Sequence, residues 1–166
     1  MGPLFNVVLV RPQIPNNTGN IGRTCVATGC SLHLVHPLAF DTSEKACRRA
    51  GLDYWPRLAV REHASWDQFQ ADARPQPVWF LSTKGRRTIF DAPLCRGDWL
   101  VFGNETQGLP EPLLAERSDR VLTLPMAREE RSLNLATAVC AVVYEGVRQA
   151  LCRGEARLDE AGRLVF

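Results

Sequence analysis

Short apolar runs alternate with amphipathic stretches along the chain. Runs rich in Val, Leu, Phe and Trp that stop at Pro, Gly or polar residues are typical of buried strands. They predict strands at residues 5–10, 32–36, 58–61, 78–82, 99–102 and 121–124. Helical spacing of apolar residues predicts helices at residues 16–28, 43–50, 65–73, 111–116 and 132–151. This alternation indicates an α/β fold, in which one parallel sheet is flanked by helices in a single domain.

Capping residues set the expected ends of these helices. The Asn-Asn-Thr run at residues 16–18 offers N-caps and Gly29 a C-cap, Ser65 caps the next helix, and Pro110 suits a first helical position. The final helix is apolar around much of its circumference, so it is expected to be buried on more than one side and to contribute to a dimer interface. The alternative is an ordinary central helix in a monomer.

Composition adds little to this picture. A chain of 166 residues with 45% hydrophobic and 23% charged residues is ordinary for a globular domain. We expect one domain over residues 1–152 and a tail over residues 153–166 that is a small hairpin or is loosely ordered. A net charge of +2 does not by itself indicate nucleic-acid binding. Basic clusters at residues 44–63 and 84–96 are either phosphate-facing patches or solvated loops.

The cysteines and histidines predict no metal site. None of the six cysteines forms a Cys-x-x-Cys pair, and the three histidines complete no ligand spacing, so reduced thiols in a cytoplasmic protein are expected. No signal peptide is recognisable. The longest uncharged helical stretch, residues 132–144, is too short to cross a bilayer, so no membrane association is expected.

Three polar segments follow strand-like runs. They are Asn-Thr-Gly-Asn-Ile-Gly-Arg at residues 17–23, Gly-Asn-Glu-Thr-Gln-Gly-Leu at 103–109 and Ser-Leu-Asn-Leu at 132–135. Strand ends are where α/β domains build sites, and glycine turns let backbone amides approach a ligand. The absence of a His or Cys nucleophile, a dinucleotide fingerprint and a P-loop disfavours common hydrolases, hydride transfer and nucleotide hydrolysis. Taken singly, each segment could be only a turn or a helix cap.

In their order, the segments resemble the motifs of a known family. Residues 14–23, residues 102–110, and residues 124–126 with 131–139 are similar to the three motifs of the SpoU-type branch of the knotted SPOUT RNA methyltransferases. The similarity extends from about Phe5 to Leu151.

A narrower resemblance concerns the substrate. The short chain, Arg-Arg-Ala-Gly-Leu-Asp-Tyr at residues 48–54 and Ser-Thr-Lys-Gly at 82–85 are similar to the minimal members that methylate the ribose 2′-OH of the pyrimidine wobble nucleotide in leucine tRNAs. Alternative targets are another tRNA position or rRNA, and a non-catalytic RNA-binding homologue is a further alternative.

The resemblance implies a C-terminal trefoil knot, a homodimer, tRNA as partner, and S-adenosyl-L-methionine (AdoMet) as cofactor with S-adenosyl-L-homocysteine as product. The implied cofactor loops contain Leu81, Gly103, Leu124, Ser132 and Leu133. The implied catalytic residues are Arg23, Asn17, Glu105, Ser132 and Asn134.

Arg23 would be the base, or would hold a phosphate or stabilise the developing alkoxide, because Arg keeps its proton far above neutral pH. Asn17 and Glu105 would orient Arg23 and the substrate, since a carboxylate fixes the plane of a guanidinium. Lys84, Arg48 and Arg49 are candidate contacts for tRNA phosphates, with solvated surface charge as the alternative.

Overall fold

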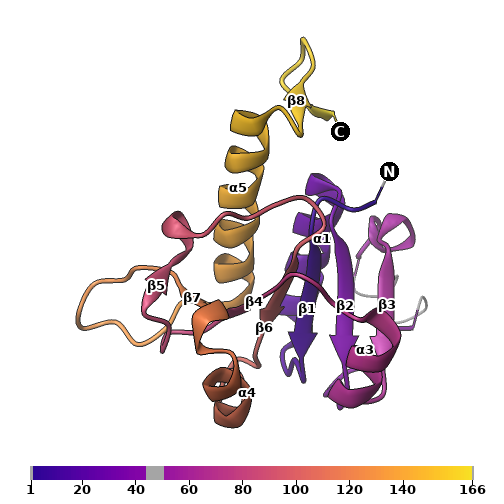
Figure 1. Cartoon of the computed structure of the whole chain (residues 1–166). Coiled ribbons are helices and arrows are strands. Elements are labelled where there is room, and N and C mark those ends of the chain that lie inside the picture. The colour runs from indigo at the N-terminus through magenta and orange to yellow at the C-terminus, as the bar shows by residue number, and fades with distance from the viewer. Residues whose placement is uncertain (1, 44–50, 166) are drawn as a thin grey trace.

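The computed structural model describes residues 2–43 and 51–165, and shows one seven-stranded sheet (Figure 1). Every neighbouring pair in it is parallel, in the order β3-β2-β1-β6-β4-β7-β5. The strands are β1 (Asn6–Val10), β2 (Ser31–Val35), β3 (Val60–His63), β4 (Val78–Leu81), β5 (Arg87–Thr88), β6 (Trp99–Phe102) and β7 (Val121–Thr123). The predicted α/β class is therefore confirmed, while the trefoil knot stays a prediction.

Helices cover both faces of the sheet. The helices are α1 (Pro15–Thr28), α3 (Trp66–Ala73), α4 (Glu111–Glu116) and α5 (Leu135–Arg153), and the short 3₁₀ turns are η1 (Trp55–Arg57), η2 (Ile89–Asp91) and η3 (Ser118–Arg120). Alternate β1 residues separate the two cores, as the strand period of two requires. Val7 and Leu9 pack in the core under α1 and α5, whereas Val8 and Val10 pack in the core under α3 and α4.

Two helix starts differ from the prediction. Helix α1 begins at Pro15, with Ile14 in the N-cap position, so Asn17 lies inside the first turn instead of capping it. Helix α5 begins at Leu135, and the Asn134 side chain caps it by accepting from the amides of Ala136 and Thr137. The observed caps, Ile14 and Asn134, thus lie two residues from the predicted helix starts at residues 16 and 132, which is the usual uncertainty of a helix boundary.

The other helix caps and the strand boundaries can also be compared with those predicted from the sequence. Gly29 closes α1 at φ 66° and Ser65 caps α3, both as predicted, whereas Pro110 is an N-cap and not a first helical residue. Strand β3 lies two residues later than expected, and β5 is too short to carry a pattern. The predicted helix at residues 43–50 lies, apart from its first residue, outside the described residues. The tail forms the hairpin β8 (Arg157–Leu158) and β9 (Leu164–Val165), which projects beyond α5 (Figure 1).

Helix α5 is the central helix of the larger core. Its 19 residues are long and apolar enough to cross a membrane by length and composition alone, whereas the expectation of no span concerned only the shorter uncharged stretch at residues 132–144. Its buried residues pack against α1 and the sheet. The hydrophobic ones are Val139, Val142, Val143, Val147 and Ala150. A core position explains this apolar composition as well as a bilayer would.

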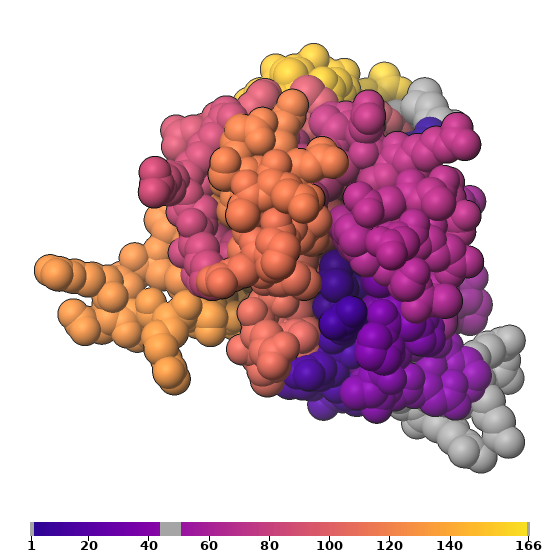
Figure 2. Space-filling model, turned by 60° about the horizontal axis from the view of Figure 1, so that its bottom comes forward, coloured from indigo at the N-terminus to yellow at the C-terminus, as the bar shows by residue number. Residues whose placement is uncertain are grey.

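The strand order places a switch point between β1 and β6. From β1 the chain continues to β2 and β3 on one side, and the remaining strands lie on the other. Ligand sites of open parallel sheets form beside such a point, outside the carboxyl ends of the strands. The chain leaving β7 forms an exposed loop over residues 124–134 that swings out from the body before α5, seen in orange in Figures 1 and 2.

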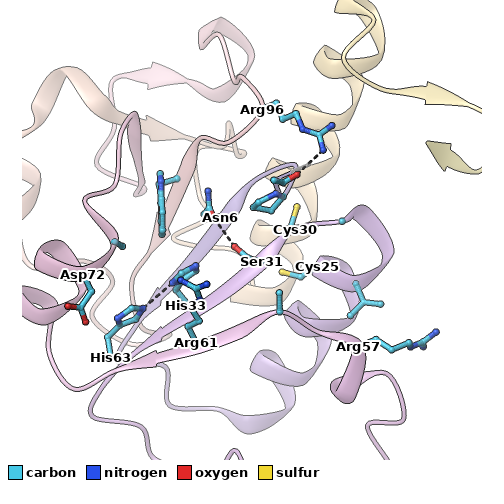
Figure 3. Close-up of a pocket in the computed structure, with 17 residues that line it drawn as sticks. Asn6, Cys25, Cys30, Ser31, His33, Arg57, Arg61, His63, Asp72 and Arg96 are labelled. Carbon is cyan, nitrogen blue, oxygen red and sulfur yellow. Dashed lines mark hydrogen bonds between the residues drawn. The ribbon is translucent and has the colours of Figure 1, made fainter. Parts of the chain in front are cut away.

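Two buried histidines join β2 to β3. His33 Nδ1 lies 3.0 Å from His63 Nε2 (Figure 3), and the rings of Phe69 and Trp99 pack around the two histidines. Burial, aided by His63 and Arg61, lowers the pKa of His33 from 6.5 to about 4. The imidazole is therefore neutral in the folded protein at neutral pH.

Acidification should destabilise the fold through His33. In the unfolded chain His33 binds a proton below about pH 6.5, whereas in the folded protein it binds one only below about pH 4. The free energy of unfolding therefore has its full value above pH 6.5 and decreases as the pH falls from 6.5 to 4. The expected loss between pH 7.5 and pH 5 is about 2 kcal/mol. Urea unfolding at both pH values measures it. His33→Phe should show a shallower pH dependence, and equal slopes in the two proteins would contradict the assignment.

Candidate active site

Glu105 joins the first two polar segments at the switch point. Its Oε2 accepts from the Gln13 amide at 2.8 Å and its Oε1 from the Ile14 amide at 3.0 Å. Oε1 also accepts from Asn17 Nδ2 at 3.1 Å. The carboxylate therefore fixes the turn between β1 and α1, and hydrogen bonds to a charged acceptor are among the stronger ones in proteins.

The third segment joins through Asn134. Its Nδ2 donates to Asn17 Oδ1 at 3.0 Å, while its own Oδ1 caps α5. Asn17 is 6% exposed and uses both ends of its amide, one toward Glu105 and one toward Asn134. We call this connected set of Glu105, Asn17 and Asn134 the amide relay. It holds together the starts of α1 and α5 and the loop after β6.

The loop after β6 is closed by backbone and side-chain contacts. Asn104 and Gly108 form an antiparallel bridge, and Asn104 Oδ1 accepts from the amides of Thr106 and Gln107. A Cβ on Gly103 would lie 2.0 Å from the Gly108 carbonyl carbon. Only glycine permits this close approach of two backbone segments.

A cavity of about 500 Å³ opens beside the relay, at the carboxyl ends of β4, β6 and β7. All five predicted cofactor residues line it: Leu81, Gly103, Leu124, Ser132 and Leu133. It also includes residues that the sequence did not single out for the cofactor, among them Thr83, Thr106, Met126 and Arg131. Leucine side chains and the backbone of glycine turns make this lining suitable for a flat heterocycle held by backbone amides.

Arg23 lies apart from this cavity and from the relay. Its Nη2 is 3.6 Å from Asp53 Oδ1, its guanidinium lies 4.5 Å from the centre of the Tyr54 ring, and its side chain is 62% exposed. The prediction that Glu105 and Asn17 orient Arg23 was therefore wrong for this single chain. Asp53 and Tyr54, which sequence reasoning noted only as part of a motif, take that role.

The remaining candidates have different surroundings. Ser132 lines the cavity, and among the described residues it makes no hydrogen bond with the relay. Lys84 also lines the cavity and forms an exposed ion pair with Glu111, which lowers the pKa of that carboxyl. An RNA phosphate would have to compete with Glu111 for Lys84. Arg48 and Arg49 lie outside the described residues.

Glu105→Gln should impair the site without unfolding the chain. The amide retains one acceptor and turns an NH₂ either toward the Gln13 backbone amide or toward the Ile14 amide and Asn17 Nδ2, so at least one hydrogen bond to a charge is replaced by donors that face each other. We expect a loss of about 2 kcal/mol, or roughly 30-fold in the rate of the methyl transfer that the resemblance predicts. Glu160→Gln, in the exposed tail hairpin and away from the cavity, is the matched control and should remain near wild type. Equal rates for both variants would remove Glu105 from the site.

The comparison with known proteins agrees with this geometry. A family model described as the SpoU rRNA Methylase family matches residues 4–144. The chain belongs to the SpoU methylase family. A tRNA (cytidine(34)-2′-O)-methyltransferase of Saccharophagus degradans is 48% identical over 147 residues, which is 88% of this chain and 96% of the relative.

Solved structures of this family superimpose on the chain. One, from work on the 2-OH methylation of C/U34 on tRNA, is 43% identical with a TM-score of 0.83 and covers 91% of this chain and 99% of its own. The SpoU methyltransferase AviRb from Streptomyces viridochromogenes, in complex with AdoMet, is 27% identical with a TM-score of 0.74 and covers 92% of this chain and 63% of its own. The predicted family is thereby confirmed.

Proposed function

We propose that the protein transfers a methyl group from AdoMet to the 2′-OH of the pyrimidine at tRNA position 34, with leucine tRNAs as its substrates. The observation that carries the proposal is the amide relay beside the glycine-walled cavity. It unites three segments far apart in the sequence at one end of the sheet. The relatives named for cytidine-34 methylation, which match this chain over nearly their whole length, support this target.

The lining of the cavity fits AdoMet. Leu81, Leu124 and Leu133 supply apolar contact for an adenine ring, and the turn at Gly103 leaves room for close backbone approach. AdoMet supplies an activated methyl group on a sulfonium, so the protein needs only to position and polarise the acceptor hydroxyl. The guanidinium of Arg23 would stabilise the oxygen as its proton passes to solvent.

The position of Arg23 outside the cavity supports a homodimer. Residues 127–134 are all exposed, Leu133 is 43% exposed and Tyr144 on α5 is 50% exposed. A second copy covering these residues would bury apolar surface and complete the site. Sedimentation at micromolar concentration should show a dimer, and Tyr144→Glu should weaken it. A wild-type protein that stays monomeric would contradict this proposal.

Transfer of labelled methyl from AdoMet to unmodified transcripts tests the reaction. The transcripts are leucine tRNAs, a tRNA with a purine at position 34, and rRNA fragments, and the labelled product is digested to nucleosides. Label in a pyrimidine 2′-O-methyl nucleoside at position 34 is expected. Label only in rRNA, or at another tRNA position, would overturn the proposed target while keeping the chemistry. Binding of AdoMet without any transfer would favour a non-catalytic homologue.

A further inference from the structure

A groove separates α3 from α4 on the face of the sheet opposite α1 and α5. Its volume is about 1090 Å³, and Val10, Trp66, Phe80 and Leu113 give it an apolar floor. In Figure 2 the magenta surface around α3 and the orange surface around α4 lie on either side of this hollow, and the indigo chain after β1 is visible at its end.

Arginines dominate the rim of this groove. They are Arg11, Arg74, Arg117 and Arg120, against the two carboxylates of Asp67 and Glu116. Arg120 stacks over Trp79 and lies 3.6 Å from Asp119. In the described part of the chain, the other three arginines form no ion pair. Unneutralised cations along one groove create a positive potential that attracts a polyanion.

The backbone at two of these arginines adopts a costly conformation. Arg11 has φ 54° and Arg74 has φ 44°, and no other described non-glycine residue has a positive φ. Both positions are ones that glycine would occupy at lower energy: Arg74 ends α3, and Arg11 forms the turn after β1. Backbone strain of this kind gathers at functional sites, where the side chain has a use that offsets it.

The groove leads into the candidate active site. Arg11 lies two residues before Gln13, whose amide Glu105 binds, and Pro110 on the groove wall directly follows the loop that walls the cofactor cavity. At the other end lie Arg74 and residues 75–77, before β4 begins. A strand of five residues spans about 17 Å, which is long enough for a groove along it to contact more than one phosphate of a nucleic-acid strand.

We propose that the groove between α3 and α4 holds the sugar-phosphate backbone of the substrate tRNA, through Arg11, Arg74 and Arg117, while the target nucleotide enters the site. This rests on the proposed function. The cavity in Figure 3 is a weaker candidate, because Asp72 faces its histidines and it extends to Gly2 and Asn6 at the amino end of β1, away from the relay.

The sharpest test separates RNA binding from stability. In the Arg11→Gly, Arg74→Gly double variant, the left-handed residues become glycine, so the urea midpoint should be unchanged or higher. Its affinity for tRNA should nevertheless fall by at least tenfold. The slope of log affinity against log salt should decrease in magnitude by about 1.5, because two phosphate contacts are lost. Calorimetry with AdoMet should give wild-type affinity.

Charge reversal supplies the matched comparison. Arg117→Glu changes the groove, and Arg57→Glu makes the same change at the cavity of Figure 3. Only Arg117→Glu should weaken tRNA binding strongly. Equal losses in both variants would show an effect of net charge alone and would overturn the proposal, as would wild-type affinity in the glycine double variant. If the wild-type protein bound AdoMet but no tRNA, the proposed function would fail together with the groove.

Discussion

Replacing Arg23 by alanine is expected to lower the rate of methyl transfer by 10²–10⁴-fold, the usual worth of a group that assists proton removal. The fold should survive, because the side chain is exposed and its ion pair with Asp53 is also exposed. AdoMet affinity should not change, since Arg23 is not among the residues that line the cavity. The rate of a single turnover at saturating AdoMet and tRNA measures the chemical step, without contributions from the affinities for AdoMet and tRNA.

Two further variants define what Arg23 contributes. Arg23→Lys keeps the charge but loses the planar fork, so a partial rescue would indicate that charge stabilises the developing alkoxide. Asp53→Asn removes the partner that orients the guanidinium and should cost less than Arg23→Ala, because Tyr54 still packs against it. Near-wild-type turnover by Arg23→Ala would exclude Arg23 from the chemistry.

The error over the partner of Arg23 has a geometric cause. Asn17 and Arg23 are six residues apart, and at about 100° per residue they lie about 120° apart around α1. Asn17 is turned inward to Glu105, so Arg23 must point elsewhere. The prediction treated residues 17–23 as one motif with a common direction. In the structure these residues belong to helix α1, so their side chains point to different sides of the helix.

The parts of the fold that could be predicted are those with a strong local pattern. Strands β1 and β6 were located to within a residue because each is a continuous apolar run. Burial on both faces of a parallel sheet requires such a run. Strand β5, with two residues, has no such pattern. The contact between Asn17 and Asn134 joins residues 117 positions apart, so it depends on strand order and not on local sequence.

The candidate site shows the same division. The five residues that the sequence motifs assigned to the cofactor all line the cavity. Each of them lies just after a strand or just before a helix, where sites of parallel sheets form. The arginines of the α3–α4 groove were missed because they come from three separate segments of the chain: the turn after β1, the end of α3 and the turn at residues 117–120. Their common property, a position on the rim of one groove, exists only after folding.

Gly103→Ala should abolish AdoMet binding. The new Cβ would lie 2.0 Å from the Gly108 carbonyl carbon, 2.2 Å from the Leu109 nitrogen and 2.4 Å from the Gly108 oxygen. All three are backbone atoms, so no side chain can rotate away and the loop over residues 103–109 must open. That loop walls the cavity and holds Glu105, so calorimetry should detect no binding and methyl transfer should be lost with it.

The matched control for this variant is Gly97→Ala. Gly97 has φ +90° and no neighbour within 4 Å of an added Cβ, so alanine there adds backbone strain of about 1–2 kcal/mol without a clash. It lies outside the cavity and should keep full AdoMet affinity at a temperature where both variants remain folded. Loss of binding in Gly103→Ala alone would therefore locate the defect in the loop wall, whereas wild-type affinity in Gly103→Ala would mean that AdoMet binds elsewhere.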